Sequence, residues 1–543
     1  MSMRVVVIGY GPVGARFVEE MLPAVADGDV ELTVVGAEAH EPYNRVLVAD
    51  YATGRADRGR LEISDPEAVR AAGVTVRLEE AATAIDRQKR LVRLFSGESV
   101  PYDRLVLAVG ARANVPTLGG LEAARRDRAV VARSPGDLDA GATRLPHGVL
   151  VMRALEDSEE LRGWLERPEP TSVVVLGAGV LGMELALAVA ETGASVSVVY
   201  HDAVPMGRNL DGNGGRVLAA LANAVGVRTH PHARAEEVVL RHDAEGRAGF
   251  AGLVCAEGSV VSGDLLVLSC GVSPRTELAA AAGLRLSTGI LVDERLRSWT
   301  DPDIAAIGDC AQLASPQDVE PAVVADPGAR VPGGPSGLIG PGWRQADWLA
   351  ESLSAEARGA AEPLALGDDR PAVVMLKAEG VDVVAAGDVT PELWDVVADL
   401  DGAGTGDPAA HRRVAVWADP GSGRYVKTVG VRGVLTGFVA VGMPRTGAEL
   451  ALLYQRGGEL PADRSVLLRL DGPDAAAPAA PSADAVTCLC NGVTAGGITE
   501  AVRSGCGTVT EVGARTRAGT GCGGCRDRIQ ELILAAAPVA AMD

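Results

Sequence analysis

Apolar runs, glycine turns and amphipathic stretches follow one another in the same order twice along the first part of the chain. Residues 5–8 form an apolar run that leads into a glycine turn, and apolar side chains then recur at helical spacing over 13–22. This pattern predicts a strand, a tight turn and a helix, followed by a second strand over 31–35. The same elements are predicted over 172–190 and 195–200. We interpret the repetition as an internal duplication of Rossmann-type units.

The hydrophobic pattern outside these two units predicts further strands, a small sheet and a linker. Buried strands that run into glycine are predicted at 102–110, 264–269 and 303–309. Short alternating runs between about 370 and 456 predict a small antiparallel sheet. An Ala/Pro/Asp-rich stretch at 471–485 has the composition of a linker.

Composition indicates a folded protein with several domains. The 543 residues have an apolar content of 47% and a formal net charge of −21, which argues against nucleic acid and anionic membrane surfaces as partners. No run approaches the roughly 20 apolar residues that span a bilayer, and a strand at the N-terminus makes a signal peptide unexpected. Eight cysteines, five of them from residue 488 onward, do not form the framework of a disulfide-rich protein in a chain this long. We therefore expect a cytoplasmic protein.

Each predicted turn carries the glycine fingerprint of a dinucleotide-binding unit. In the first, Gly9 makes the tight turn, Gly11 lets backbone approach a pyrophosphate, and Gly14 packs the helix on the strand. The start of the helix offers partial positive charge to that anion. Glu38, after the second strand, is expected to bind ribose hydroxyls. A tight turn without a ligand is the alternative, which the repeat and Glu38 argue against.

The second fingerprint is Gly177-x-Gly179-x-x-Gly182, with Glu184 just inside its helix. Asp202 occupies the ribose position of this unit, where a carboxylate repels the 2′-phosphate of NADPH and so favours NADH. NADPH stays open because two basic side chains near Asp202 could accept that phosphate. They are His201 and Arg208.

The most specific signal lies near the C-terminus, where four cysteines form two close pairs. The pairs are Cys488-Leu-Cys490 and Cys522-Gly-Gly-Cys525. Four thiolates can hold a 2Fe–2S cluster, which moves one electron at a time. Structural zinc uses the same ligands, but Cys-x-Cys is unusual among the common zinc modules, so we favour the cluster. Two dinucleotides and a one-electron centre together predict a short electron-transfer chain.

Asp309 follows Gly308 at the end of the third predicted buried strand. An Asp in this place can hydrogen-bond the ribityl chain of a flavin, and a helix is expected to begin after it. An Asp that only caps such a helix is the alternative.

Three further cysteines, Cys255, Cys270 and Cys310, are isolated in the sequence. Neither Cys-x-x-Cys nor Cys-x₄-Cys occurs in this region, so a redox-disulfide mechanism is not expected. We interpret these thiols as buried small hydrophobes.

These motifs resemble those of a known family. The first 350 or so residues resemble FAD- and NAD(P)H-dependent pyridine-nucleotide oxidoreductases. More narrowly, they are similar to the flavin portion of the assimilatory nitrite reductase large subunit and to the electron-transfer subunit of assimilatory nitrate reductase. Residues 486–535 resemble the 2Fe–2S domain of the bacterioferritin-associated-ferredoxin type. The segments that carry the likeness are 9–19, 42–47, 205–211, 276–278, 306–311, 337–346 and 516–525.

The resemblance implies an α/β fold class with two Rossmann-like dinucleotide-binding domains, a small α+β domain and a small C-terminal helical 2Fe–2S module. It adds Arg45 and Gly110 to the residues expected at FAD, and it gives FAD, NADH or NADPH and a 2Fe–2S cluster as the cofactors. The expected parts are an FAD-binding domain at 1–145 and 269–355, an NAD(P)H-binding domain at 146–268, the α+β domain at 366–460, the linker at 471–485 and the 2Fe–2S domain at 486–535.

Three departures from the family pattern stand out. The usual Ala-Thr-Gly reads Ala108-Val-Gly110, so the Thr hydroxyl is absent. A frequent Ser pair is replaced by Ala49-Asp50, which changes one expected contact to the flavin. The chain also carries no further cysteine constellation for the sirohaem and 4Fe–4S modules of the full nitrite reductase subunit. We therefore expect that it does not reduce nitrite by itself.

The expected function is that of an enzyme that passes electrons from NADH through FAD and the cluster to a partner. By resemblance the partner is the catalytic subunit of a molybdenum nitrate reductase or a nitrite reductase, and a homodimer is considered. Two alternatives remain at this stage. The chain could reduce another carrier, such as a rubredoxin or a ferredoxin, or it could be a redox- or iron-responsive regulator without turnover.

Overall fold

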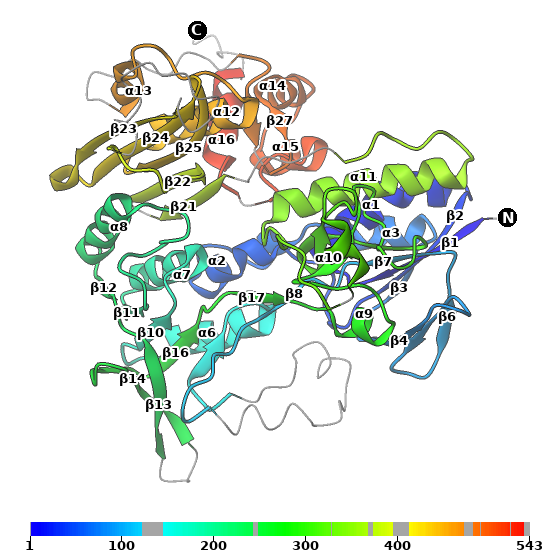
Figure 1. Cartoon of the computed structure of the whole chain (residues 1–543), viewed down its shortest axis with the longest axis horizontal. Helices are drawn as coiled ribbons and strands as arrows, with labels where there is room; N and C mark the ends of the chain where they lie inside the picture. Colours follow the sequence, from blue (N-terminus) through cyan, green and yellow to red (C-terminus); the bar gives the residue numbers. More distant parts are fainter. Residues whose placement is uncertain are drawn as a thin grey trace, which may run out of the picture.

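The computed structural model describes residues 2–121, 145–242, 248–326, 328–366, 373–378, 380–394, 412–471, 482–488, 490–521 and 523–536. Most of the predicted linker lies outside these residues, and so does Cys522. In Figure 1 the two Rossmann-type units form the lower part of the molecule, and the small antiparallel sheet and the C-terminal helices lie above them.

The first unit is built on a parallel sheet with the strand order β19-β7-β1-β2-β3. Val5 and Val7 of β1 are fully buried, because a parallel strand with helices on both faces has no solvated side. Helix α1 (Pro12–Ala26) follows the glycine turn, and α11 (Ile339–Ala357) returns from far along the chain to pack against it. The strands are β1 (Met3–Ile8), β2 (Val30–Val35), β3 (Thr75–Arg77), β7 (Arg104–Leu107) and β19 (Ile304–Ala306).

The second unit repeats this topology with the order β12-β11-β10-β16-β9. Strands β16, β10, β11 and β12 correspond to β7, β1, β2 and β3, and all neighbours are parallel. The two sheets therefore support the predicted duplication. The strands are β9 (Val149–Val151), β10 (Ser172–Leu176), β11 (Ser195–Val199), β12 (Val227–His230) and β16 (Leu265–Leu268), and the helices are α6 (Leu155–Leu165), α7 (Val180–Glu191) and α8 (Gly212–Ala224).

Each unit also carries an antiparallel three-stranded sheet between its Rossmann strands. These are β4 (Ala82–Asp86), β5 (Leu91–Leu94) and β6 (Ser99–Pro101) in the first, and β13 (Ala235–His242), β14 (Ala248–Cys255) and β15 (Val260–Ser262) in the second. Two short pairs are β8 (Ala111–Ala113) with β17 (Val272–Pro274) and β18 (Ile290–Val292) with β20 (Ala311–Leu313). Short helices are α2 (Val48–Ala52), α3 (Pro66–Ala71), α9 (Glu277–Ala281) and α10 (Pro321–Ala325), with 3₁₀ turns at Arg45–Leu47, Gly59–Leu61 and Gly308–Cys310.

The small domain contains the predicted antiparallel sheet, in the order β21-β22-β25-β24-β23. One face packs on α12, and the other joins the apolar core of α7 and α8. The strands are β21 (Val374–Ala378), β22 (Val381–Gly387), β23 (Arg412–Asp419), β24 (Arg424–Val431) and β25 (Val434–Val441). They are followed by α12 (Pro444–Arg456) and α13 (Ser465–Leu468), with 3₁₀ turns at Pro420–Ser422 and Arg469–Asp471.

The C-terminal module has its own small core of Ile498, Val512, Ala518 and Ile529. A capping box at Thr508 and Glu511 fixes the start of α15. Its elements are β26 (Val486–Cys488), β27 (Val493–Thr494), α14 (Ala495–Arg503), α15 (Val509–Thr516) and α16 (Arg526–Ala536). The α/β fold class with two Rossmann-like units, a small mixed domain and a helical module is thus confirmed, whereas the exact domain boundaries stay a prediction.

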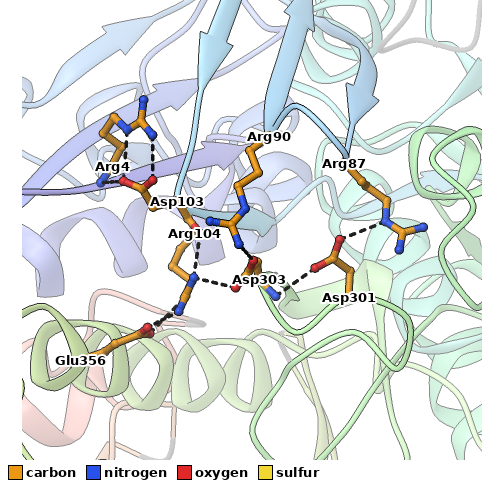
Figure 2. A network of polar contacts seen from close by, with 8 residues as sticks. All are labelled: Arg4, Arg87, Arg90, Asp103, Arg104, Asp301, Asp303 and Glu356. Atoms are coloured by element: carbon orange, nitrogen blue, oxygen red, sulfur yellow. Dashed lines mark hydrogen bonds and ion pairs between the residues drawn. The ribbon is translucent and has the colours of Figure 1, made fainter.

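A polar network holds together the edge of the first sheet at which the parallel strands begin (Figure 2). Asp303, just before β19, accepts a hydrogen bond of 2.6 Å from Arg104 and pairs with Arg90 of the β4–β5 turn. Arg104 also pairs with Glu356 of α11, and Arg4 holds the pKa of Asp103 down to about 2 through hydrogen bonds to its carboxylate. The longest-range direct contact of the network joins residues 252 apart in the sequence, and the network lies at the end of the sheet opposite to the first glycine turn.

A buried ion pair joins the small domain to the second Rossmann unit. The Lys427 side chain is 1% exposed, and its Nζ lies 3.5 Å from Oδ2 of Asp211, the N-cap of α8. The Tyr425 hydroxyl donates to the same oxygen at 2.7 Å. The chain has only three lysines, and burial of a lysine is costly unless a partner compensates its charge.

Lys427→Met is expected to lower the free energy of unfolding by about 3 kcal/mol, because the Asp211 carboxylate would stay buried without its cation. The measurement is the first transition in a urea or thermal unfolding curve, since a chain of several domains does not unfold in one step. Lys89→Met is the matched control: Lys89 is 68% exposed, and its loss should change stability by less than about 0.5 kcal/mol. Equal midpoints for the two variants would contradict the role given to Lys427.

Candidate functional site

The first glycine turn is shaped by close backbone packing. Gly9 has φ = +106°, and a Cβ on it would overlap the carbonyl oxygen of Ala108 at the end of β7. A Cβ on Gly14 would likewise overlap the carbonyl oxygen of Gly9. Gly11 is different, because it is the N-cap of α1 and a Cβ built on it would meet only the guanidinium of Arg45, 3.7 Å away. Gly9 and Gly14 are thus required by the turn itself, and Gly11 leaves the helix N-terminus open to a ligand.

The second turn repeats this arrangement. Gly177 has φ = +113° and lies against the carbonyl of Ser269 after β16, while Gly182 lies against the carbonyl of Gly177. No atom lies within 4 Å of a Cβ built on Gly179, the N-cap of α7. Glu184 is half-buried inside α7. In each fingerprint the first and third glycines are therefore required by the turn, and the second leaves space at the helix N-terminus.

Glu38 lies at the centre of a polar cluster behind β2. Arg45 forms an ion pair with Oε1 of Glu38, and the Tyr43 hydroxyl donates to Oε2 at 2.9 Å. Burial raises the pKa of Glu38, but the charge of Arg45 and the hydrogen bonds from Arg45 and Tyr43 outweigh it, so the pKa is lowered. A carboxylate has about four lone-pair sites, so this ionised Glu38 can still accept bonds from ribose hydroxyls.

Asp309 is connected to the same region by an arginine that the sequence did not single out. Arg153 forms an ion pair with Oδ2 of Asp309 at 2.8 Å and donates to the carbonyl of Ala111 at 3.2 Å. Its own carbonyl oxygen lies 3.5 Å from the Arg45 guanidinium. The expectation of a helix after Asp309 is wrong. Asp309 lies in a 3₁₀ turn that runs directly into β20, because Gly308, with φ = +72°, turns the chain there.

Gly110 directly precedes β8, and Asp50, one of the sequence departures, lies in α2, which packs against α6 and α7. Gly110 has φ = +67°, and its carbonyl accepts a hydrogen bond of 2.9 Å from the backbone of Arg275. Asp50, which replaces a hydroxyl residue of the family pattern, lies 3.5 Å from Arg55. Tyr43 and Arg153 were missed in the sequence because their roles depend on partners five to 156 residues away.

Asp202 lies on an exposed rim of the second unit. Its carboxylate is 3.3 Å from Nε2 of His201, and its carbonyl accepts a hydrogen bond of 3.1 Å from the backbone of His232. Arg208 is exposed near the same turn. A ligand can therefore reach the Asp202 carboxylate without displacing a buried partner.

Three of the four predicted cluster cysteines lie in described parts of the chain, and Cys522 lies outside them. The hydrogen bond between the thiols of Cys488 and Cys525 lowers the pKa of Cys488 to about 6, and backbone N–H groups of Gly519 and Asn491 act in the same direction. Cys490 packs against Gly521, the residue before Cys522. The described residues include no group of three His, Cys, Asp or Glu side chains at the spacing of a single metal ion.

The arrangement of these thiols fits a 2Fe–2S cluster. Such a cluster takes two cysteine thiolates on each iron. The thiols of Cys488 and Cys525 are adjacent. Cys490 lies next to Gly521, the residue that precedes Cys522. N–H groups directed at sulfur are the interactions that tune the potential of a cluster.

The other cysteines lie apart from one another. Cys255 and Cys310 are buried, and burial raises the pKa of Cys310 to about 11. Cys270 is only partly buried, which corrects its interpretation as a core residue, although burial still raises its pKa to about 11. The described cysteines form no disulfide. A redox disulfide beside the two dinucleotide turns is therefore absent from the described chain.

Comparison with known proteins identifies the family. The profile "Pyridine nucleotide-disulphide oxidoreductase" matches residues 3–327, more than half of the chain, and the profile "BFD-like [2Fe-2S] binding domain" matches 486–535. The chain belongs to the pyridine nucleotide-disulphide oxidoreductases. It is an oxidoreductase whose cofactors are FAD, NAD(P)H and a 2Fe–2S cluster, which confirms the predicted enzyme class and cofactors. The roles of individual residues in binding them stay predictions.

Relatives of this oxidoreductase match it over only part of their own length. The nitrite reductase [NAD(P)H] large subunit of Klebsiella oxytoca is 29% identical over 97% of this chain and 48% of its own. The assimilatory nitrate reductase electron transfer subunit of Bacillus subtilis is 26% identical over 98% and 59%. Rhodocoxin reductase of Rhodococcus erythropolis is 31% identical over 58% and 66%. The chain thus spans about half the length of the first of these relatives.

The fold also occurs in solved structures. The superposition on a chain of the covalent putidaredoxin reductase–putidaredoxin complex covers 86% of this chain and 95% of that chain. The TM-score is 0.64 and the sequence identity is 20%. At this identity the likeness concerns the fold alone. Within the described residues, no helix is long and apolar enough to cross a membrane.

Two glycines of the second turn should respond differently to a methyl group. Gly177→Ala is expected to destabilise the chain and abolish NADH oxidation, because its Cβ would overlap the Ser269 carbonyl at a φ that alanine rarely adopts. Gly179→Ala should keep the unfolding midpoint but raise the KM for NADH about tenfold or more, because the methyl would enter the space left for the pyrophosphate. Thermal unfolding and steady-state kinetics measure both effects. A normal KM in Gly179→Ala would contradict the assignment of this turn to NAD(P)H.

Proposed function

We propose that this chain delivers electrons from NADH to a partner reductase of nitrate or nitrite assimilation. When bound, FAD accepts a hydride from the nicotinamide, and the cluster carries the electrons away one at a time. The observation that carries the proposal is the position of the C-terminal module. Arg517 of the module forms ion pairs with Glu20, at 2.7 Å, and with Glu19 of α1, the helix that begins at the FAD-binding fingerprint.

In this proposal the first Rossmann unit holds FAD. The N-terminus of α1, in the turn of Gly9, Gly11 and Gly14, would hold its pyrophosphate. Glu38, kept ionised by Arg45, binds the ribose. Two other residues, Gly110 and Asp309, line the flavin end.

The second unit holds NAD(P)H at the N-terminus of α7, through Gly177, Gly179 and Gly182. Glu184 and Asp202 complete this set. The module holds the 2Fe–2S cluster with Cys488, Cys490, Cys522 and Cys525. The assignment of the partner rests on the relatives named as nitrite reductase and as nitrate reductase electron transfer subunit. The proposal also includes a cytoplasmic location and a homodimer.

One observation favours a second candidate. The FAD- and NAD(P)H-binding part is 31% identical to rhodocoxin reductase, so an enzyme that reduces a separate small carrier protein is also supported. A higher kcat/KM with a rubredoxin or a 2Fe–2S ferredoxin than with a nitrate reductase catalytic subunit would favour this alternative.

The cluster assignment is tested with Cys525→Ser. The variant should keep NADH-dependent bleaching of the flavin and lose most of the NADH oxidation that depends on the nitrate reductase subunit and nitrate, because a cluster ligand is missing. Cys506→Ser is the matched control, since this thiol belongs to the same module but lies outside the four-cysteine set; it should transfer electrons normally. Undiminished transfer by Cys525→Ser would rule out the route through the cluster.

The nucleotide preference is tested with Asp202→Asn, which removes the charge and keeps the size of the side chain. The ratio of kcat/KM for NADH to that for NADPH should fall by about tenfold or more, because the 2′-phosphate would no longer be repelled. Glu257→Gln removes an exposed carboxylate elsewhere in the same unit and should leave the ratio unchanged. An unchanged ratio in Asp202→Asn would mean that another residue selects the nucleotide.

A further inference from the structure

The loop that leads into the last two cysteines is fastened to the first Rossmann unit by a buried asparagine. Asn44 is 0% exposed. Its Nδ2 donates to the carbonyls of Thr520, at 3.0 Å, and Gly521, at 2.6 Å, while its Oδ1 accepts from the backbone of Val46 at 3.0 Å. The side-chain amide thus donates both of its hydrogens to the carbonyls of the two residues directly before Cys522.

A tryptophan of α11 contacts the same loop from another direction. Trp343 is 6% exposed, and its Nε1 donates to the carbonyl of Pro12 at 3.1 Å. A Cβ on Gly521 would lie only 2.9 Å from Cζ3 of Trp343 and 2.9 Å from the Cβ of Cys490. Gly521 therefore fills the gap between the indole and a predicted cluster ligand, and a larger residue does not fit.

Asn44, and Pro12 to which Trp343 donates, belong to segments that the proposed function assigns to FAD. Asn44 is adjacent to Arg45, the partner of Glu38, and Pro12 is adjacent to Gly11 at the start of α1. The segments around Asn44 and Pro12 thus lie between the expected flavin site and the cluster-binding loop. A small displacement of this loop would change the separation of the two redox groups, which is the property the protein controls in a cofactor enzyme.

We propose that Asn44 and Trp343 are positioning residues that dock the cluster-binding loop against the FAD-binding unit, and that electrons pass within the chain in this docked arrangement. The inference rests on the proposed function, and it adds the place and the residues of the internal transfer. Neither residue forms a bond to a cofactor in this scheme. Each acts through the loop 517–521.

The test uses two conservative variants of the full chain. Asn44→Asp keeps the acceptor for Val46 but loses both donors and brings a negative charge to two carbonyls. Trp343→Phe loses the bond to Pro12 and shortens the side chain whose Cζ3 and Cη2 contact Gly521. Trp348→Phe is the matched control: it lies in the same helix, is 9% exposed, and loses a comparable bond to the carbonyl of Leu364, away from the module.

The first readout is amide hydrogen exchange of the full chain, which does not depend on activity. Peptides that cover 509–521 and 42–47 should exchange about tenfold faster in Asn44→Asp and Trp343→Phe, because their shared hydrogen bonds and contacts are weakened. The control should match the wild type. Unchanged exchange in both variants would overturn the proposed docking.

The second readout is anaerobic stopped-flow mixing with NADH, followed at flavin and cluster wavelengths. Flavin bleaching should stay within about twofold of the wild type, and the following cluster reduction should slow by about tenfold or more. Iron content and dithionite reduction show whether each variant still holds its cluster. Normal cluster reduction in both variants would overturn the inference and leave the proposed function intact. A wild-type cluster that NADH does not reduce would instead overturn the proposed function, and the exchange data alone would then decide the docking.

Discussion

The structure depends on one steric constraint that occurs twice. Where β1 and β10 end, the chain must turn directly against the carbonyl at the end of the neighbouring strand, so neither Gly9 nor Gly177 can carry a side chain. This contact places the start of α1 and of α7 at the carboxyl edge of its sheet. Ligands of open α/β sheets bind at that edge. The two turns thus fix where the N-termini of α1 and α7 lie relative to their sheets.

Residues from distant parts of the chain lie around the carboxyl edge of the first sheet. Arg45 and Tyr43 come from the segment after β2, Arg153 from the start of the second unit, Asp309 from after β19 and Trp343 from α11. The network of Figure 2 secures the opposite edge of the same sheet, so the strands that present these residues are held at both ends. The C-terminal module then packs against the outside of this edge, which brings the predicted cluster ligands next to the first Rossmann unit.

Much of this arrangement could be predicted from the sequence because it depends on local pattern. Glycine spacing, apolar runs and alternating runs gave both Rossmann units and the antiparallel sheet, and paired cysteines gave the cluster module. The contacts of Asn44, Arg153, Trp343 and Lys427 could not be predicted in this way. Each depends on a partner in another domain or on another element far along the chain, and a single polar residue carries no signal of such a partner. The helix expected after Asp309 failed for a related reason, because Gly308 and the pairing of β20 with β18 decide the local backbone.

The central claim is that electrons run from nicotinamide to the C-terminal cluster within one chain. Anaerobic titration of the purified wild-type chain with NADH, followed by visible absorption and EPR, tests it most directly. We expect the flavin to bleach and the EPR signal of a reduced 2Fe–2S cluster to develop without any added mediator. Flavin bleaching with no EPR signal, in a protein whose iron content shows an intact cluster, would contradict it.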